Sequence, residues 1–198
     1  TFREFVLVLQ DDINLRRADG SPVPPVNGGT VASPAVEDSE DSGNKAINYR
    51  TEPIWFRGGW APETPMETTR NFPNFHLIMH NNWVGQDPET PIFRANLGNP
   101  TRLRVVHPGG HEQPIIFDVH GHIWQEQPYL TGNNSRVIGD NTTSEWQGFR
   151  DGLGPSDHHD ALLKGGAGGM MGVRGDYVCR DYSPTHFDDG LWNLLRVQ

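Results

Sequence analysis

Lysine is scarce in this chain. Only two of its 198 residues are lysine, Lys45 and Lys164, and the formal net charge at pH 7 is −9. Charge-driven binding to nucleic acid or to an anionic membrane surface requires clustered basic side chains, so the sequence excludes both partners. No apolar run approaches the roughly 20 residues that cross a bilayer, and we therefore expect no membrane span.

Cysteine is scarcer still, because Cys179 is the only one. A single cysteine forms no disulfide within the chain, so cysteine usage does not report the redox compartment. The first residues lead directly into an expected strand, without the basic and apolar segments of a secretory signal peptide. We expect Cys179 itself to be an inert, half-buried thiol on a strand.

Glycine and proline are plentiful, at 23 and 16 residues. This composition favours short strands joined by turns over a helical bundle. Runs of apolar and β-branched residues, separated by Gly, Pro and Asn, predict an all-β antiparallel sandwich. The expected strands are Phe5–Gln10, Pro91–Ala95, Thr101–His107, Ile115–Trp124, Gly175–Arg180 and Leu191–Val197.

The chain is expected to form one domain over residues 1–198, with two long irregular segments. Residues 20–44 are a Pro/Gly-rich surface loop with an acidic cluster at 37–41, and residues 57–90 are a Pro-rich insertion. One segment is ambiguous. Ser156 and Gly165, at the two ends of the segment 156–165, are typical helix-capping residues and predict one short helix. A family resemblance instead makes Asp160–Leu163 a strand, and we favour the strand because local signals over so few residues are weak.

A His-Gly-His sequence ends the strand expected at 115–124. Side chains two apart on a strand share a face, so His120 and His122 are expected to point the same way. Two imidazoles on one face suit copper, nickel, zinc or iron, and His107 and His111 would extend the group to four. The alternative is structural, with both imidazoles bonded to backbone or carboxylate groups, and we favour it because further ligands are missing.

Three segments, in order, resemble the C-terminal cupredoxin domain of multicopper oxidases. They are PIFRANLGNPTRLRVVHPGGH at 91–111, FDVHGHIWQ at 117–125 and GDYVCRDYSPTHFDDGLWNLLRV at 175–197. Together with INYRTEPIWFR at 47–57 and QDPETP at 86–91, they are most similar to the large manganese-oxidase-like branch. The resemblance covers about half of the chain and implies a Greek-key cupredoxin-like β-sandwich with long irregular loops.

The resemblance also implies that most copper ligands of the family are replaced. His120 falls on a ligand of the trinuclear copper centre, whereas Asp118 and Ile115 fall where the family has histidines. His186 falls on the second histidine of the type 1 copper site. The His-Cys-His triplet of the family becomes Arg180, Asp181 and Tyr182, and Cys179 lies two residues before the copper cysteine. We expect Asp118 and Arg180 to form an ion pair in place of a metal.

By this resemblance, the chain is a cupredoxin domain or subunit that has lost its own type 1 copper. It would have a structural role, packing against other cupredoxin domains or subunits outside the cytoplasm, in the extracellular space or the periplasm. It would be a separate chain, a processed fragment or part of a longer protein.

The alternative is a copper-binding oxidase domain whose His120, His122, His111 or His186 completes an interdomain cluster that oxidises metal ions or small reductants with O2. A third possibility is a binding module that attracts cations to residues 37–41.

Overall fold

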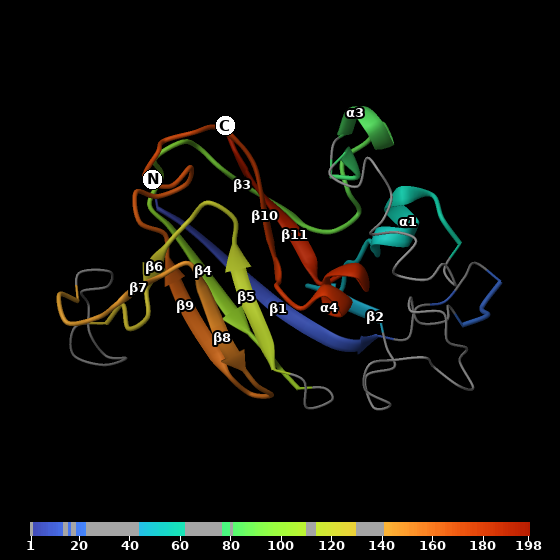
Figure 1. Ribbon diagram of the computed structural model, residues 1–198, viewed down its shortest axis with the longest axis horizontal. Helices are drawn as coiled ribbons and strands as arrows, with labels where there is room; N and C mark the ends of the chain where they lie inside the picture. Colours follow the sequence, from blue (N-terminus) through green and yellow to red (C-terminus); the bar gives the residue numbers. More distant parts are fainter. Residues whose placement is uncertain are drawn as a thin grey trace.

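The computed structural model describes residues 2–13, 16, 19–22, 44–61, 77–79, 81–109, 114–129 and 141–198. Two sheets, in the strand orders β2-β1-β4-β9 and β3-β11-β10-β5-β8, form a sandwich with a short β6-β7 ribbon at one side (Figure 1). The strands are β1 (Arg3–Ile13), β2 (Asn44–Ile47), β3 (Ile92–Ala95), β4 (Thr101–Val106), β5 (Ile115–Val119), β6 (Trp124–Gln125), β7 (Trp146–Gln147), β8 (Phe149–Leu153), β9 (His158–Leu162), β10 (Gly175–Asp181) and β11 (Trp192–Val197). The described helices are α1 (Ile54–Gly58), α3 (Asn81–Val84) and α4 (Pro184–Asp188), and none of them is long and apolar enough to cross a membrane.

This architecture confirms the predicted all-β, cupredoxin-like sandwich. It differs from the prediction in strand direction, because β1 runs parallel to β4 and β3 runs parallel to β11. The expectation of a purely antiparallel sandwich is therefore wrong. Parallel neighbours need long crossover connections, and both pairs are separated by long stretches of chain that contain other elements.

The ambiguous segment after Ser156 is a strand. β9 pairs antiparallel with β4, with Leu103 opposite Ala161 and Arg102 opposite Leu162. The strand expected there is confirmed, and the short helix suggested by local caps is wrong, because pairing along β4 outweighs weak local signals. Residues 23–43, which include the acidic cluster at 37–41, lie outside the described part of the chain.

The main core fills the space between the two sheets. Strands β4 and β5 bury alternate side chains, with Leu103 and Val105 facing Phe117 and Val119 across the sandwich. Burying one large apolar side chain contributes about 1.5–3 kcal/mol, so these alternating positions fix which face of each strand turns inward.

A second apolar cluster lies on the other face of the five-stranded sheet. Trp192 and Leu194 of β11 pack there with Ile54 of α1, Ile78 and Phe187 of α4. Their neighbours Leu195 and Val197 belong instead to the main core. Strand β11 is therefore buried on both faces, which explains why its sequence lacks the alternation of a half-exposed strand.

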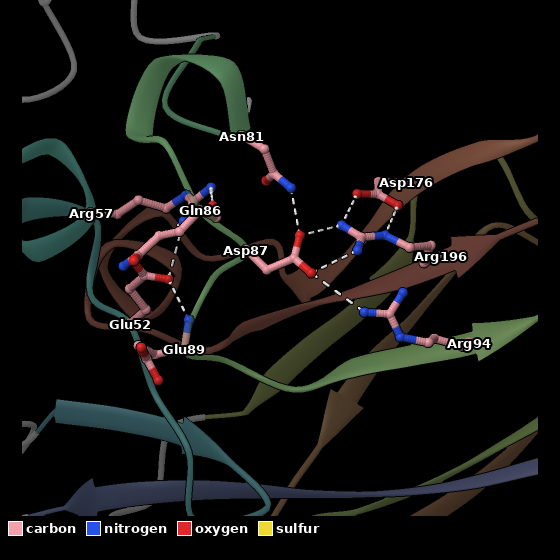
Figure 2. A network of polar contacts seen from close by, with 9 residues as sticks. All are labelled: Glu52, Arg57, Asn81, Gln86, Asp87, Glu89, Arg94, Asp176 and Arg196. Carbon is pink, nitrogen blue, oxygen red and sulfur yellow. Dashed lines mark hydrogen bonds and ion pairs between the residues drawn. The ribbon is translucent and has the colours of Figure 1, made fainter.

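A buried ion pair joins the segments around this second cluster. Both oxygens of Glu52 lie 3.3 Å from Nη1 of Arg57, and Glu52 also accepts the backbone N–H of Glu89 at 2.8 Å (Figure 2). Arg57 donates through Nε to the carbonyl of Ile78 at 2.7 Å and contacts that of Gln86 at 3.5 Å. The pair thus links three stretches of the chain, 52–57, the one at Ile78 and 86–89.

A second polar network fastens the segment before β3 to the sheet. Arg196 makes two hydrogen bonds to Asp87, at 2.7 and 2.8 Å, and two to Asp176, at 2.7 and 2.8 Å (Figure 2). Asp87 also accepts from Asn81 of α3 at 2.5 Å and lies 3.4 Å from Arg94. The hydrogen bond with Arg196 is the main reason why the pKa of Asp87 lies well below its usual range.

Candidate functional site

Strands β5 and β10 bring two of the candidate residues, Asp118 and Arg180, side by side. Arg180 stands directly opposite Asp118 in the antiparallel register, and its Nε donates to Oδ2 of Asp118 at 3.3 Å. The guanidinium also lies over two aromatic rings, 5.1 Å from the centre of Tyr182 and 5.3 Å from that of Phe187. The contact expected between Asp118 and Arg180 is present, and it is only partly buried.

The neighbouring residue on β10 faces the opposite side of the sheet and makes a buried pair. Oδ2 of Asp181 lies 2.5 Å from Nδ1 of His186, and both side chains are almost fully buried. The other oxygen, Oδ1, accepts the backbone N–H groups of Ile116 and Ser183, each at 3.0 Å. Asp181 therefore ties β5, β10 and α4 together through one carboxylate. Because a carboxylate only accepts, the proton shared with His186 sits on Nδ1.

The two histidines of the His-Gly-His sequence do not share a face. Strand β5 ends at Val119, and the chain turns at His120 and Gly121, whose φ of 73° lies in the left-handed region. His120 is exposed, whereas His122 is buried. The prediction that strand alternation places both imidazoles on one face is therefore wrong, since glycine at a left-handed turn breaks the period of two.

His122 has backbone partners on both ring nitrogens. The N–H of Gly168 donates to Nε2 at 3.1 Å, so the ring proton sits on Nδ1, which lies 3.0 Å from the carbonyl of His120. Burial lowers the pKa of His122, which keeps the ring neutral. The ring also packs edge-on against Tyr177. This arrangement favours the structural interpretation of His122, because no lone pair is left for a metal.

The remaining candidate histidines of the His-Gly-His group are His107 and His111. His111 is outside the described residues, and His107 is fully buried, with neither ring nitrogen hydrogen-bonded within the described part of the chain. Burial lowers the pKa of His107. Among the described residues, no three His, Cys, Asp or Glu side chains come close enough to hold a metal ion.

Cys179 lies in the main core, opposite Val119 of β5 and Asn193 of β11. The side chain is fully buried, and burial raises the pKa of the thiol far above its usual range. The sequence predicted a half-buried thiol, and its burial is more complete than that.

We expect Cys179 to be unreactive in the folded protein. Attack on a disulfide reagent requires an accessible thiolate, and this thiol is neither accessible nor ionised. Reaction with an aromatic disulfide at pH 8 should proceed no faster than unfolding and should become rapid in concentrated urea. Fast, stoichiometric labelling in buffer alone would contradict this placement.

An open pocket of about 720 Å³ lies beside the Asp118–Arg180 pair. Asp118, His120, His122 and Asp151 are its polar lining residues, and Phe149 and Tyr182 contribute exposed aromatic surface. Most of the remaining lining is apolar, with one imidazole, that of His120, exposed. Such a surface is suited to packing against another protein surface more than to acid–base chemistry.

Several polar pairs were not predicted from the sequence. Asp181–His186 and Glu52–Arg57 each join residues five apart, a spacing with no helical or strand signature. The resemblance placed Asp181 and His186 at two type 1 copper positions, but it did not predict their hydrogen bond.

Comparison with known proteins gives the following likenesses. No protein-family model and no curated protein matches the chain. Among solved structures, the McoA multicopper oxidase from the hyperthermophile Aquifex aeolicus is similar at 12% identity and a TM-score of 0.48, over 100% of this chain and 29% of that one. A copper-containing nitrite reductase from Thermus scotoductus is similar at 11% identity and a TM-score of 0.46, over 99% and 31%. A blue copper oxidase from Nitrosomonas europaea is similar at 21% identity and a TM-score of 0.41, over 56% and 31%. The chain spans less than half the length of these three structures.

Proposed function

We propose that this chain is a cupredoxin-like domain or subunit of a multicopper-oxidase-like protein, with a structural and assembly role and no type 1 copper of its own. One observation carries the proposal. Two side-chain pairs, Asp118–Arg180 and Asp181–His186, occupy four positions at which the family resemblance places copper ligands. Residues bonded to one another in this way have their hydrogen-bonding and charge requirements met without a metal.

The residues present do not fit a type 1 copper. Such a site needs a thiolate and two imidazoles in a trigonal arrangement. Ile115, at the first histidine position, is apolar and buried, and Asp181 stands at the cysteine position. The Nδ1 of His186 is already bonded to Asp181. Cys179, the only thiol, faces the core between Val119 and Asn193.

Asp118 and Arg180 stand where the resemblance places two ligands of the trinuclear centre. Arg180 carries a permanent positive charge, which opposes a cation at the same place. His120 keeps an exposed imidazole and supports the alternative, in which it contributes to a copper cluster shared with another domain. Within the part of the chain that the structure describes, His120 is the candidate that supports this alternative best, because the ring nitrogens of His122 and Nδ1 of His186 already have partners.

The expected partners are other cupredoxin domains or subunits, and the expected location is extracellular or periplasmic. The exposed rings of Phe149 and Tyr182 beside the 720 Å³ pocket support an assembly role, because exposed aromatic groups around an apolar hollow are typical of protein interfaces. The third possibility, cation attraction by residues 37–41, concerns residues outside the described ones.

Copper analysis tests the proposal. The chain, produced with and without added copper, should contain far less than one copper per molecule by elemental analysis, and it should give no copper signal in paramagnetic resonance. Its thermal unfolding midpoint should be the same in both preparations. Stoichiometric copper that is lost in His120→Ala and kept in the matched variant His158→Ala would overturn the proposal in favour of the interdomain cluster.

A further inference from the structure

Strand β1 is covered along only part of one edge. In the sheet order β2-β1-β4-β9, β4 runs beside β1 from Arg3 to Val8 on one side. On the other side, β2 pairs with β1 only from Leu9 onward, so it lies beside the far half of the strand (Figure 1). In the described part of the chain, the stretch from Phe2 to Val6 therefore has no neighbouring strand on that side.

The hydrogen bonds of β1 identify the backbone groups that point to this open edge. Arg3 donates its N–H to the carbonyl of Pro100, which directly precedes β4. The carbonyl of Val8 points the opposite way and accepts the N–H of the residue that follows β2. Because the direction alternates along a strand, Glu4 and Val6 also point to the open side. The N–H and C=O of Glu4 and the N–H of Val6 have no hydrogen-bond partner among the described residues.

Asn48 closes this edge at the point where β2 leaves it. Its Oδ1 accepts the N–H of Val8, and its Nδ2 donates to the carbonyl of Val6, each at 2.8 Å. The side chain thus replaces the backbone of a neighbouring strand for two residues. The open stretch therefore runs from residue 2 to residue 6, with Glu4 at its centre.

The side chains on the outer face of this stretch have a symmetric pattern. Phe2 and Val6 are large apolar residues, 50% and 48% exposed, and each lies two residues from Glu4. Glu4 accepts from Nε of Arg102 on β4 at 2.7 Å, so its charge is matched within the sheet. Exposed apolar side chains on an unpaired strand edge favour pairing with another strand.

We propose that this edge pairs with the same edge of a second copy of the chain, antiparallel and about a twofold axis at Glu4. Each Glu4 then exchanges its N–H and C=O with its counterpart, and each Val6 N–H meets the carbonyl of Phe2 of the second copy. The exposed rings of Phe2 cover the exposed side chains of Val6 across the axis. The apolar, acidic, apolar order is the same in both directions from Glu4, as a self-complementary twofold contact requires.

The pairing joins the two four-stranded sheets into one continuous sheet. β2 does not obstruct it, because β2 pairs with β1 beyond the open stretch and so lies at opposite ends of the contact in the two copies. The contact involves neither the 720 Å³ pocket nor the positions considered for copper, so it is independent of the proposed function.

The charge of the chain gives the contact a salt dependence. Each copy carries a formal net charge of −9, and two Glu4 carboxylates meet at the axis. Salt screens this repulsion, so the dimer should tighten between about 50 mM and about 500 mM sodium chloride. A single strand pairing buries less area than a standard interface, so a weak, concentration-dependent dimer is expected.

Sedimentation equilibrium of the full chain, from about 5 µM to about 500 µM, measures the dimer. Val6→Pro removes an N–H that no described residue uses and leaves the bonds of β1 to β4 in place, since proline is tolerated where the N–H faces away from the sheet. It should weaken dimerisation by about tenfold or more. Val6→Ile keeps the N–H and the apolar contact, and should dimerise as the wild type does.

Val6→Lys provides a second variant that keeps the backbone donor. Val6 is about half exposed, so lysine there should leave folding intact, which urea unfolding verifies. Lysine reduces the net negative charge and thereby favours association, yet it removes the apolar contact and should weaken the dimer.

Hydrogen exchange followed by mass spectrometry locates the contact. In the wild type, protection of the segment 2–8 should rise with protein concentration, and in Val6→Lys it should not. A chain that stays monomeric at the highest concentration and salt would overturn the proposal. A dimer that forms without added protection at 2–8, or equally well in Val6→Pro and Val6→Lys, would place the contact elsewhere and would also overturn it.

Discussion

Arg57→Met should destabilise the protein by about 3–5 kcal/mol, because it leaves the buried carboxylate of Glu52 without its cation. The side chains of Glu52 and Arg57 are 1% and 0% exposed, so solvent does not replace the lost partner. The carbonyls of Ile78 and Gln86 lose a donor at the same time. Urea unfolding followed by circular dichroism measures the change, and the exposed Arg50→Met is the matched control, with an effect of less than about 1 kcal/mol.

The loss of stability in Arg57→Met should depend on pH. Burial raises the pKa of Glu52 above 4.5, and Arg57 works against that rise. Removing Arg57 therefore raises the pKa of Glu52 further. A group with a raised folded-state pKa contributes stability that is fully present below its unfolded pKa and is lost as pH rises through the folded value. The difference between Arg57→Met and wild type should therefore be smaller at pH 4 than at pH 7.

The double variant Glu52→Gln/Arg57→Met separates charge from packing. It removes the buried charge, so it should be more stable at pH 7 than Arg57→Met alone and should lose the extra pH dependence. If the single and double variants unfold alike at both pH values, the cost of Arg57→Met comes from the lost packing and backbone contacts instead.

Gly166→Ala should destabilise the protein by about 3 kcal/mol or more, whereas Gly172→Ala should cost about 1–2 kcal/mol. Both glycines have positive φ, 74° and 60°, so both substitutions incur the same kind of backbone strain. They differ in their surroundings. A Cβ at Gly166 would lie 2.5 Å from the carbonyl oxygen of Asn99, whereas a Cβ at Gly172 would meet nothing within 4 Å.

Thermal and urea unfolding of the two variants measure this difference. The backbone of Asn99 cannot rotate away as a side chain can, so the turn at 165–169 must shift. That shift would also disturb Gly168, which donates to His122. If Gly166→Ala and Gly172→Ala were equally stable, the close approach to Asn99 would be shown to have no energetic weight.

Much of the sandwich could be predicted from the sequence. Strands β4, β10 and β11 carry dense β-forming residues between Gly and Pro turns, and their expected and observed bounds differ by one residue each. Strand β5 begins at Ile115 as expected but ends at Val119, five residues before the expected end. The directions of β1 and β3 were not predictable, since strand patterns are the same for parallel and antiparallel neighbours at this length. The turn at His120–Gly121 was missed because a strand pattern continues across it, and only the left-handed φ of Gly121 interrupts it.

The candidate site was predicted only where strand register decides contacts. Asp118 and Arg180 were placed on neighbouring strands, and their contact followed. Which side chain receives which partner inside the core depends on long-range packing. Asp181 of β10 and His186 of α4 meet only after the helix packs against the strand, so no local pattern indicates their contact.

The position of β11 has a consequence for synthesis of the chain. It is the last strand in chain order, yet it lies between β3 and β10 in the five-stranded sheet. Its parallel partner β3 is about 100 residues earlier, with Ile92 opposite Leu194. At about 5–20 residues per second, a ribosome needs several seconds to bridge that interval. During that time the edge of β3 that will pair with β11 has no neighbour, whereas β10 ends only shortly before β11 begins. Chaperones that shield exposed strands should therefore act on β3 in the nascent protein before β11 emerges.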